Sequence, residues 1–446
     1  MKKVYYFVLT LLLALSCRGG RPLPSTPEAP DLRPTPLQIA DNPDLADGLI
    51  YVYDFKAEPP MTPAPKGYKP FYISGFNRHG ARFAMKEQYE MVKNALEAGA
   101  KAGVLTPLGE QFHKAYGLFY DYAILRQGEL SHLGIEEMRT IGERVYRRFP
   151  EVFEGPTKAS ALATPVGRVI VSMASFIDAL QALDPDLDAY EYSSESNSVI
   201  LRPNWSELNV KSRKSVDELT APYEPYFRQT VDVEGILGRL FTNSSKALAS
   251  EKKVVFIRAL YDISNGIRCI GWEGNTFEGI FTPDDRLPVI RGAWYRLMLF
   301  LGRVEGSGSL YPDFTAYTLK DIIDKADEDI ASGEVQLRLR FSHDSSIFPL
   351  AVYMNIDGKG RTARNPEEAM EIFRPWDMPM GGGLQMIFFR KGNDPKILVK
   401  VLWNEREAQI DLPGGPYYDW EQFKEVYGAR IEGTLEMIDS LRHAND

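Results

Sequence analysis

The sequence predicts an α/β protein with a central, mostly parallel sheet flanked by helices and an inserted, mainly helical cap. Two observations support this fold class. Strand-like and helix-like segments alternate near both ends of the folded part of the chain, and a long middle stretch is rich in helix-prone and aromatic residues. Alternation of strands and helices is typical of a parallel sheet covered by helices. The middle stretch interrupts that alternation, so we expect it to form the cap.

The first strand is expected at residues 71–77, an aromatic and apolar run. Residues 86–100 have apolar side chains at helical spacing, and residues 108–125 form a second helical segment. A third helix is expected at residues 131–148, because it begins at a serine, a good N-cap, and ends before a proline. One strand and three helices therefore open the folded part.

A short apolar run at residues 159–163 predicts the next strand, and a helix is expected from Pro165 to Leu183, since proline suits a first helical turn. Residues 335–341 alternate apolar and polar side chains, as a strand does. Two more strands are expected at residues 384–390 and 397–403, before a C-terminal helix at 420–443.

These elements predict the domain boundaries. Residues 1–16 are expected to be a signal peptide, and residues 17–45 a lipidated cysteine followed by a proline-rich tether. The α/β domain is assigned residues 46–85, 130–202 and 330–446. The helical cap is assigned residues 86–129 and 203–329.

The N-terminal segment has the pattern of an export signal. Two lysines precede an apolar run at residues 4–15, which is too short to span a bilayer comfortably. Ser16 precedes Cys17, and the stretch resembles a bacterial lipoprotein signal, although Ala14 occupies the position where leucine is commonest. We expect an exported protein of the periplasm or cell envelope, anchored in the membrane by a lipid on Cys17. Plain cleavage of the signal is the alternative.

Charge and cysteine content narrow the class of protein further. The formal net charge is −9, which argues against a broadly basic nucleic-acid binder. A local basic pocket for an anionic substrate is compatible with that charge. Of the two cysteines, Cys269 has no intramolecular partner once Cys17 is lipidated, so we interpret it as a small buried apolar side chain.

The segment Arg78-His79-Gly80-Ala81-Arg82 directly follows the first expected strand. A neutral imidazole can attack phosphorus, and guanidinium groups bind phosphate oxygens in a fork while staying charged. Neighbouring positive charges should lower the pKa of His79 and keep it a nucleophile. An ordinary polar turn is the alternative interpretation of this segment.

Two further segments carry side chains suited to the same chemistry. His343 and Asp344 follow the strand at 335–341, where the histidine could donate to a phosphate oxygen and the acid could protonate a leaving alkoxide. A helix N-cap is the alternative for Asp344. Arg168 lies in the first turn of the helix after the strand at 159–163, an awkward place for a cation unless an anion binds there. Its alternative is a solvated surface arginine.

Together these segments resemble the histidine acid phosphatases, branch 2 of the histidine phosphatase superfamily. The resemblance rests on Arg-His-Gly-x-Arg at 78–82, on Thr-x-x-x-Arg-x-x-x-Ser at 164–172, and on the late His-Asp pair at 343–344. Residues 130–149 are also similar to a helix of the family. The sequence Val-Lys-Val-Leu-Trp-Asn-Glu at 399–405 is similar to a strand of multiple inositol polyphosphate phosphatases.

The resemblance implies a role for each site residue. His79 would be the nucleophile and Asp344 the proton donor. Lys86 matches a lysine that touches substrate in several bacterial phytases of the family, with an exposed helix-start lysine as the alternative. The phosphate would be held by Arg78, Arg82, Arg168 and His343.

The chain departs from parts of the family pattern. Ala84 stands where the family usually has proline, and His343-Asp344-Ser345 stands where several inositol polyphosphate phosphatases have His-Ala-Glu. Many exported phytases are rich in disulfides, which this chain does not use.

The sequence therefore predicts metal-independent hydrolysis of phosphate monoesters through a phosphohistidine, with inositol polyphosphates or sugar phosphates as substrates. We expect no cofactor, no metal ion and no nucleic-acid partner. Since Asp344 must be protonated to act as the acid, activity should favour acidic pH. The alternative is a non-catalytic, phosphate-binding envelope lipoprotein on the same fold.

Overall fold

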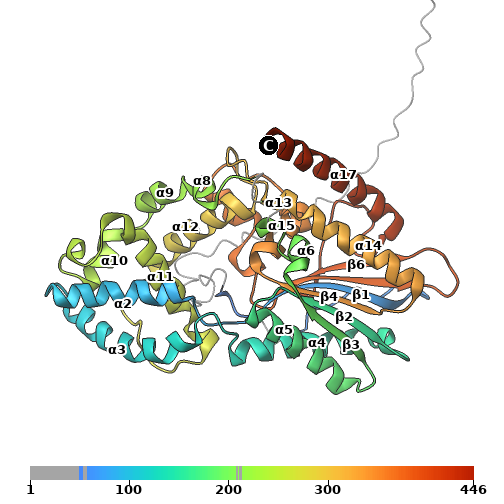
Figure 1. The fold of residues 1–446 in the computed structure, drawn as a ribbon, viewed down its shortest axis with the longest axis horizontal. Helices are drawn as coiled ribbons and strands as arrows, with labels where there is room; N and C mark the ends of the chain where they lie inside the picture. The colour runs from blue at the N-terminus through green and yellow to red at the C-terminus, as the bar shows by residue number, and fades with distance from the viewer. Residues whose placement is uncertain (1–49, 54–57, 207–208, 210–212, 446) are drawn as a thin grey trace, which may run out of the picture. The chain divides into compact units, whose positions relative to one another are not determined.

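The sheet at the centre of the fold follows the order β3-β2-β4-β1-β5-β6-β7, and β8 pairs with β6 (Figure 1). The computed structural model describes residues 50–53, 58–206, 209 and 213–445. The strands are β1 (Lys69–Arg78), β2 (Lys158–Ala163), β3 (Asp188–Ser193), β4 (Leu337–Ser342), β5 (Gly383–Arg390), β6 (Leu398–Trp403), β7 (Arg406–Glu407) and β8 (Tyr418–Asp419).

Most of the sheet is parallel. Strand β4 pairs in parallel with β1 and with β2, and β2 pairs in parallel with β3. Strand β5 is antiparallel to both β1 and β6, so β6 again runs in the direction of β1. The mostly parallel sheet expected from the sequence is confirmed, with β5 as the long strand that reverses direction.

Strand β1 is buried on both faces, which explains its nearly continuous apolar sequence. Successive side chains of a strand point to opposite faces. Tyr72 and Phe76 accordingly belong to one hydrophobic cluster, whereas Ile73 belongs to another. The central strand therefore joins two cores, one on each side of the sheet.

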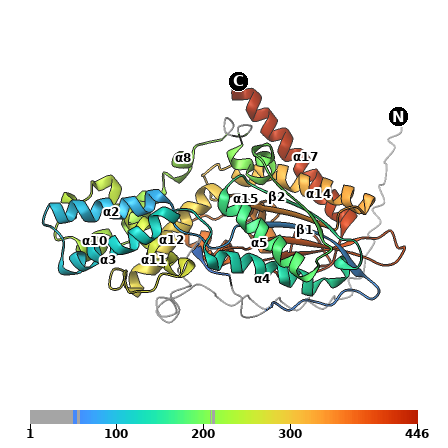
Figure 2. The ribbon, with the colours of Figure 1, turned by 60° about the horizontal axis from the view of Figure 1, so that its bottom comes forward.

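Helices cover both faces of the sheet (Figures 1 and 2). Helices α4 (His132–Arg148) and α5 (Gly167–Leu183) lie together on one face, with Met138, Ile141 and Phe176 in the cluster that contains Ile73. Helices α14 (Ala316–Ser332), α15 (Asp344–Tyr353) and α17 (Trp420–Asn445) lie on the other.

A further group of helices forms the cap, on the left of Figure 1. They are α2 (Lys86–Lys101), α3 (Pro107–Ala123), α8 (Val216–Thr220), α9 (Tyr223–Thr230), α10 (Val233–Leu240), α11 (Lys253–Gly266) and α12 (Pro283–Leu301). Helix α2 packs against α3 and α11, and α12 packs against α9. The short helices α6 (Ser198–Leu201), α13 (Tyr311–Phe314) and α16 (Pro366–Ile372) complete the set described here. The inserted, mainly helical cap predicted from the middle of the sequence is present.

The expected elements agree with the structure except near some ends. Helix α5 begins at Gly167 and not at Pro165, because Val166 is still extended (φ −122°, ψ 123°). The expected domain boundary at residue 330 falls inside α14. This helix is bound to the sheet by two ion pairs of 2.6 Å, in which Asp329 pairs with Arg338 of β4 and Asp321 with Arg340. The domain assignment as a whole stays a prediction.

The predicted signal peptide and Cys17 lie outside the described residues. Among those that are described, no helix is both long and apolar enough to cross a membrane.

Candidate active site

The three sequence motifs meet where β1, β4 and β2 end. The backbone N–H of His79 donates to Ser342 O over 3.1 Å, and the N–H of Thr164 donates to Phe341 O over 3.2 Å. Parallel strands end at one edge of a sheet, so residues that follow them share a crevice. The structure therefore brings His79, Arg168 and Asp344 to one place, although they lie far apart in the sequence.

The two histidines lie edge to face, with ring centroids 5.5 Å apart. His79 Nδ1 lies 2.9 Å from Gly80 O, and a carbonyl oxygen can only accept, so Nδ1 carries the proton. The Nε2 atom of His79 is then an unprotonated lone pair. An imidazole held in this tautomer presents a nucleophilic nitrogen to the crevice.

His343 is held in the opposite tautomer. Arg168 Nη2 lies 3.3 Å from His343 Nδ1, and a guanidinium can only donate, so Nδ1 accepts. Its Nε2–H then donates to the Thr164 hydroxyl over 3.2 Å. Side chains following β2 and β4 thus fix this ring as a neutral donor.

Arginine side chains surround His79 on several sides. Arg78 is fully buried, donates to Met378 O over 2.8 Å and forms an ion pair of 2.8 Å with Asp344. Within the described part of the chain, the buried Nε atoms of Arg78, Arg82 and Arg168 have no hydrogen-bond partner. Buried donors without acceptors are rare in folded proteins. The positive charges of Arg168, Arg78 and Arg82 all act on His79, so the crevice suits an anion with several oxygens.

The pKa of His79 is lowered well below its usual value, first by burial and then by the Arg168 and Arg78 guanidiniums. The imidazole therefore stays neutral over the physiological pH range. The direction agrees with the one expected from the neighbouring charges, but burial is the larger cause. The pKa of His343 is lowered for the same two kinds of reason, with Arg168 as the first charge.

Asp344 is ionised in this arrangement. Burial alone would raise its pKa, but Arg78 and Arg82 outweigh burial and lower it. A phosphate dianion beside the carboxyl would act in the opposite direction. Asp344 is the first residue of α15, after the N-cap His343, and its Oδ1 accepts the Ser345 N–H over 2.6 Å. The N-cap of α15 is therefore His343, and the N-cap alternative considered for Asp344 is wrong.

A buried glutamate of α4 accepts a hydrogen bond from the backbone of the loop after β1. Glu137 on α4 is fully buried and accepts the Ala81 N–H at 2.5 Å and the Tyr53 N–H at 3.2 Å. Burial raises its pKa to about 7. The role of Glu137 was not predicted from the sequence, although a glutamate next to Met138 on the apolar side of an amphipathic helix is a signal for it.

The loop also depends on close backbone contacts. A Cβ on Gly80 would lie 2.3 Å from Gly134 O, so no larger residue fits there. Arg78 N donates to Gly382 O and Gly381 N donates to His79 O, over 2.8 and 2.9 Å. The glycines at 381–383 thus approach the site closely.

Two other residues named from the sequence lie off the centre of the site. Lys86 is the first residue of α2, and its half-exposed side chain pairs with Glu90 over 3.4 Å, so its placement is that of an exposed helix-start lysine. Its contact with substrate stays a prediction. Cys269 is buried as a free thiol, which confirms its interpretation as a small core residue.

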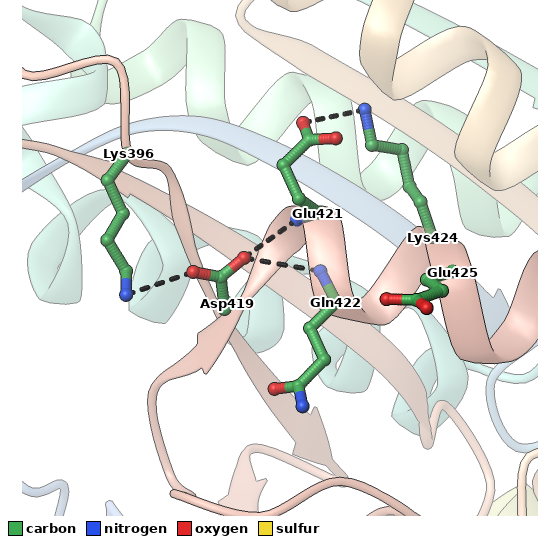
Figure 3. Close-up of a pocket in the computed structure, with 6 residues that line it drawn as sticks. All are labelled: Lys396, Asp419, Glu421, Gln422, Lys424 and Glu425. Carbon is green, nitrogen blue, oxygen red and sulfur yellow. Dashed lines mark hydrogen bonds and ion pairs between the residues drawn. The ribbon is translucent and has the colours of Figure 1, made fainter.

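Another pocket, of about 870 Å³, lies at the start of α17 (Figure 3). Its charges are paired with one another: Lys396 with Asp419, and Lys424 with Glu421, each over 2.9 Å. Because its cations are already matched by carboxylates, this pocket is a poorer anion site than the crevice at His79. No group of three potential metal-ligating side chains occurs among the residues that the structure describes.

A family model, described as histidine phosphatase superfamily (branch 2), matches residues 76–251, which include His79, Arg82 and Arg168. Residues 76–251 are therefore similar to branch 2 of the histidine phosphatase superfamily. This similarity indicates a phosphatase. No curated protein sequence matches this chain.

Solved structures share the fold of this chain. The multiple inositol polyphosphate phosphatase of Bifidobacterium longum, in complex with inositol hexasulfate, is 16% identical with a TM-score of 0.68, over 85% of this chain and 96% of that one. Its phosphate complex gives a TM-score of 0.69 at 16% identity, over 86% and 98%. The phytase of D. castellii gives 0.63 at 14% identity, over 87% and 85%.

Proposed function

We propose that this phosphatase hydrolyses phosphate monoesters without a metal ion, through a phosphohistidine on His79. The observation that carries the proposal is the Nε2 lone pair of His79 among three arginines whose buried Nε–H groups lack acceptors. In binding, the guanidiniums of Arg78, Arg82 and Arg168 would take the oxygens of the phosphoryl dianion. The Nε2–H of His343 would turn from the Thr164 hydroxyl to a phosphate oxygen.

The first chemical step forms a bond between His79 Nε2 and phosphorus while the bond from phosphorus to the ester oxygen breaks. Asp344 transfers its proton to the leaving oxygen, which departs as an alcohol. Protonation of Asp344 depends on the substrate, since the dianion offsets the Arg78 charge that otherwise keeps the carboxyl ionised.

The second step regenerates the enzyme. Asp344, now a carboxylate, takes a proton from water while the water oxygen attacks phosphorus and the bond to His79 Nε2 breaks. Inorganic phosphate is released and Asp344 is again protonated. The fixed hydrogen bond from His79 Nδ1 to Gly80 O keeps the ring oriented through both displacements.

The test is turnover of p-nitrophenyl phosphate and glucose 1-phosphate in excess chelator, with wild type beside His79→Ala. We expect turnover by the wild type and a loss of at least a thousandfold in the variant, since removal of a nucleophile leaves little of the rate. Full activity in His79→Ala would end this mechanism. Stabilisation by phosphate with no turnover of any ester would favour the non-catalytic alternative.

For the substrate we propose inositol polyphosphates or sugar phosphates. Support comes from the shared fold with the B. longum phosphatase, whose complex holds inositol hexasulfate. Rates on inositol hexakisphosphate and on a set of sugar phosphates would rank the candidates. Equal, poor rates on all of them, with rapid turnover of a phosphorylated peptide, would contradict this choice.

We also propose that the protein is exported and anchored by a lipid on Cys17, on the strength of the sequence Leu13-Ala14-Leu15-Ser16-Cys17. Expression of the full chain with Cys17→Ser should move it from the membrane fraction to the soluble periplasmic fraction. An unchanged distribution would contradict the anchor.

A further inference from the structure

Strand β3 forms one edge of the sheet (Figure 1), since it pairs with β2 and with no other strand of the described residues. The N–H of Asp188 donates to Thr157 O over 3.0 Å, so this residue and every second one after it direct their backbone groups toward β2. Those of Ala189, Glu191 and Ser193 point away from the sheet. Within the described part of the chain, none of these outward groups forms a backbone hydrogen bond.

The same edge exposes large side chains. Among the described residues, ten large hydrophobic side chains are exposed, and five of them belong to α5 or β3: Ile170, Val171, Leu183, Tyr190 and Tyr192. Tyr190 and Tyr192 are 64% and 40% exposed, and their rings stack with centroids 6.2 Å apart. An exposed apolar patch beside an unpaired strand edge marks a surface on which another chain can bind.

The two faces of β3 carry different side chains. Ala189 packs against the hydrophobic cluster that contains Phe176 of α5, so the odd-numbered residues lie on the α5 face of the sheet. Because successive side chains of a strand alternate, Asp188, Tyr190 and Tyr192 lie on the opposite face. A partner strand would therefore meet an aromatic face and an α5 face at this edge.

We propose that a second copy of this chain binds this edge, with β3 antiparallel to β3 about a two-fold axis, so that the sheets of the two copies become continuous. A two-fold axis is the commonest symmetry of a homodimer and presents the same surface from both sides. In an antiparallel pair, residues whose backbone groups point outward face each other. The register that opposes Ala189 to Glu191 meets this requirement, and it places Tyr190 opposite its own copy. The inference is independent of the proposed function.

This register also matches the side chains of the two strands. Tyr190 meets its copy in a non-hydrogen-bonded pair, a place where aromatic pairs stabilise a sheet. Asp188 lies opposite Tyr192, so each carboxylate faces a ring with a hydroxyl donor. On the α5 face Glu191 meets Ala189, so no two carboxylates are directly opposed. A shift by two residues would either oppose Glu191 to its own copy, which is repulsive, or leave Tyr192 beyond the partner strand.

Helix α5 extends the contact beyond the strand. The pKa of Glu191 is raised first by burial and then by the charge of Asp178, so the Asp178 side of α5 borders the edge. Val171 lies about two helical turns before Asp178, on the same side, and is 42% exposed. Stable interfaces bury about 800 Å² on each partner, more than a strand of six residues offers, so α5 has to contribute to the contact.

The test is analytical ultracentrifugation of the full chain carrying Cys17→Ser, which removes the proposed lipid site. We expect a species of twice the mass of one chain that dissociates on dilution. Tyr190→Glu should shift this species to the monomer, because two carboxylates then face each other across the axis. A parent chain that stays monomeric over about a hundredfold range of concentration would overturn the inference and leave the edge to another occupant.

Leu118→Glu is the matched control, since Leu118 is a 67% exposed residue of α3 in the cap, away from β3. It adds the same charge and should leave the dimer unchanged. Equal weakening by Leu118→Glu and Tyr190→Glu would show a general effect of charge and overturn the inference. Thermal unfolding separates lost pairing from lost folding.

Cysteine cross-linking tests the register independently. In a non-hydrogen-bonded antiparallel pair the Cα atoms lie about 4.5 Å apart, within the range of a disulfide. Tyr190→Cys should therefore link two chains on mild oxidation, as seen on a non-reducing gel, whereas Glu191→Cys should not, because its copy lies two residues out of register. The parent chain, which keeps the buried Cys269, gives the background. Cross-linking at 191 and not at 190, or at neither position, would overturn this pairing.

Discussion

The backbone N–H of Ala81 donates to Glu137 Oε2 over 2.5 Å, from the middle of the segment that carries His79 and Arg82. The other oxygen of the same carboxylate accepts the Tyr53 N–H over 3.2 Å. Because the two donors approach different oxygens, a glutamine would place an NH₂ group opposite one of them. Glu137 therefore positions the loop without touching the proposed substrate.

Glu137→Gln should consequently weaken the loop. One buried N–H is left facing an NH₂ group, which costs about 2 kcal/mol of unfolding free energy. We expect kcat on p-nitrophenyl phosphate to fall about tenfold, because the position of His79 is less well defined. Urea unfolding and steady-state kinetics measure the two effects.

Glu136→Gln is the matched control, since Glu136 is the exposed neighbour on the same helix. Its stability and kcat should equal those of wild type.

The stability of Glu137 variants should also depend on pH. Because the folded-state pKa of Glu137 is raised to about 7, the folded protein binds a proton at this residue that the unfolded chain releases. The stability advantage of wild type over Glu137→Gln should shrink as pH rises from about 4.5 to 7. An advantage that grows over that range would contradict the assignment.

The proton-donor role of Asp344 predicts a dependence on the leaving group. Asp344→Asn keeps the oxygen that accepts the Ser345 N–H but cannot donate a proton to an alkoxide. We expect kcat for glucose 1-phosphate to fall about 10² to 10⁴-fold. The loss for p-nitrophenyl phosphate should be much smaller, because nitrophenolate leaves readily as an anion. Equal losses on both esters would argue against general-acid catalysis by this residue.

The lowered pKa of His79 predicts that stability is lost in acid. The unfolded chain takes up a proton at this histidine near pH 6.5, whereas the folded protein does so only at a much lower pH. Stability therefore rises with pH up to about 6.5 and falls below it. Between pH 7.5 and 5.5, wild type should lose about 1.4 kcal/mol more unfolding free energy than His79→Gln. Urea unfolding at both pH values checks this, and parallel losses would contradict it.

The sequence predicted much of the site because its polar residues directly follow strands. Arg78 is the last residue of β1, and His343 and Thr164 directly follow β4 and β2, so parallel pairing of these strands brings them together. The direction of β5 was not predicted, because a buried antiparallel strand has the same apolar run as a parallel one.

Contacts that depend on tertiary packing were less accessible to sequence analysis. No pattern in the neighbouring sequence indicates that Glu137 accepts the Ala81 N–H. None indicates that Arg258 of the cap and Arg82 line the same cavity. The ionised state of Asp344 in the absence of phosphate was not predicted either. It depends on the 2.8 Å ion pair with Arg78, and the periodicity of a strand carries no information about that distance.

The resemblance at residues 399–405 pointed to a segment whose role the structure now clarifies. Glu405 is buried, adopts a left-handed backbone conformation (φ 62°), and accepts from Arg144 over 2.9 Å and from the Tyr53 hydroxyl over 2.8 Å. Arg144 and Glu137 both lie on α4, so the same helix holds Glu405 and supports the loop at Ala81. Glu405 is therefore a structural partner of α4, and it is not one of the residues proposed to bind or cleave the ester.

Arg144→Gln should then destabilise the protein by about 3 kcal/mol, because the buried Glu405 carboxylate loses its 2.9 Å partner and keeps only Arg148 at 3.6 Å and the Tyr53 hydroxyl. Arg147→Gln, on the same helix but about half exposed, should cost less than about 1 kcal/mol, since its pairs with Glu58 and Glu143 are screened by solvent. Urea unfolding compares the two variants, and kcat of the folded fraction of Arg144→Gln should stay within a few-fold of wild type. Equal destabilisation by both variants would show that the buried pair carries no special share of the stability of this fold.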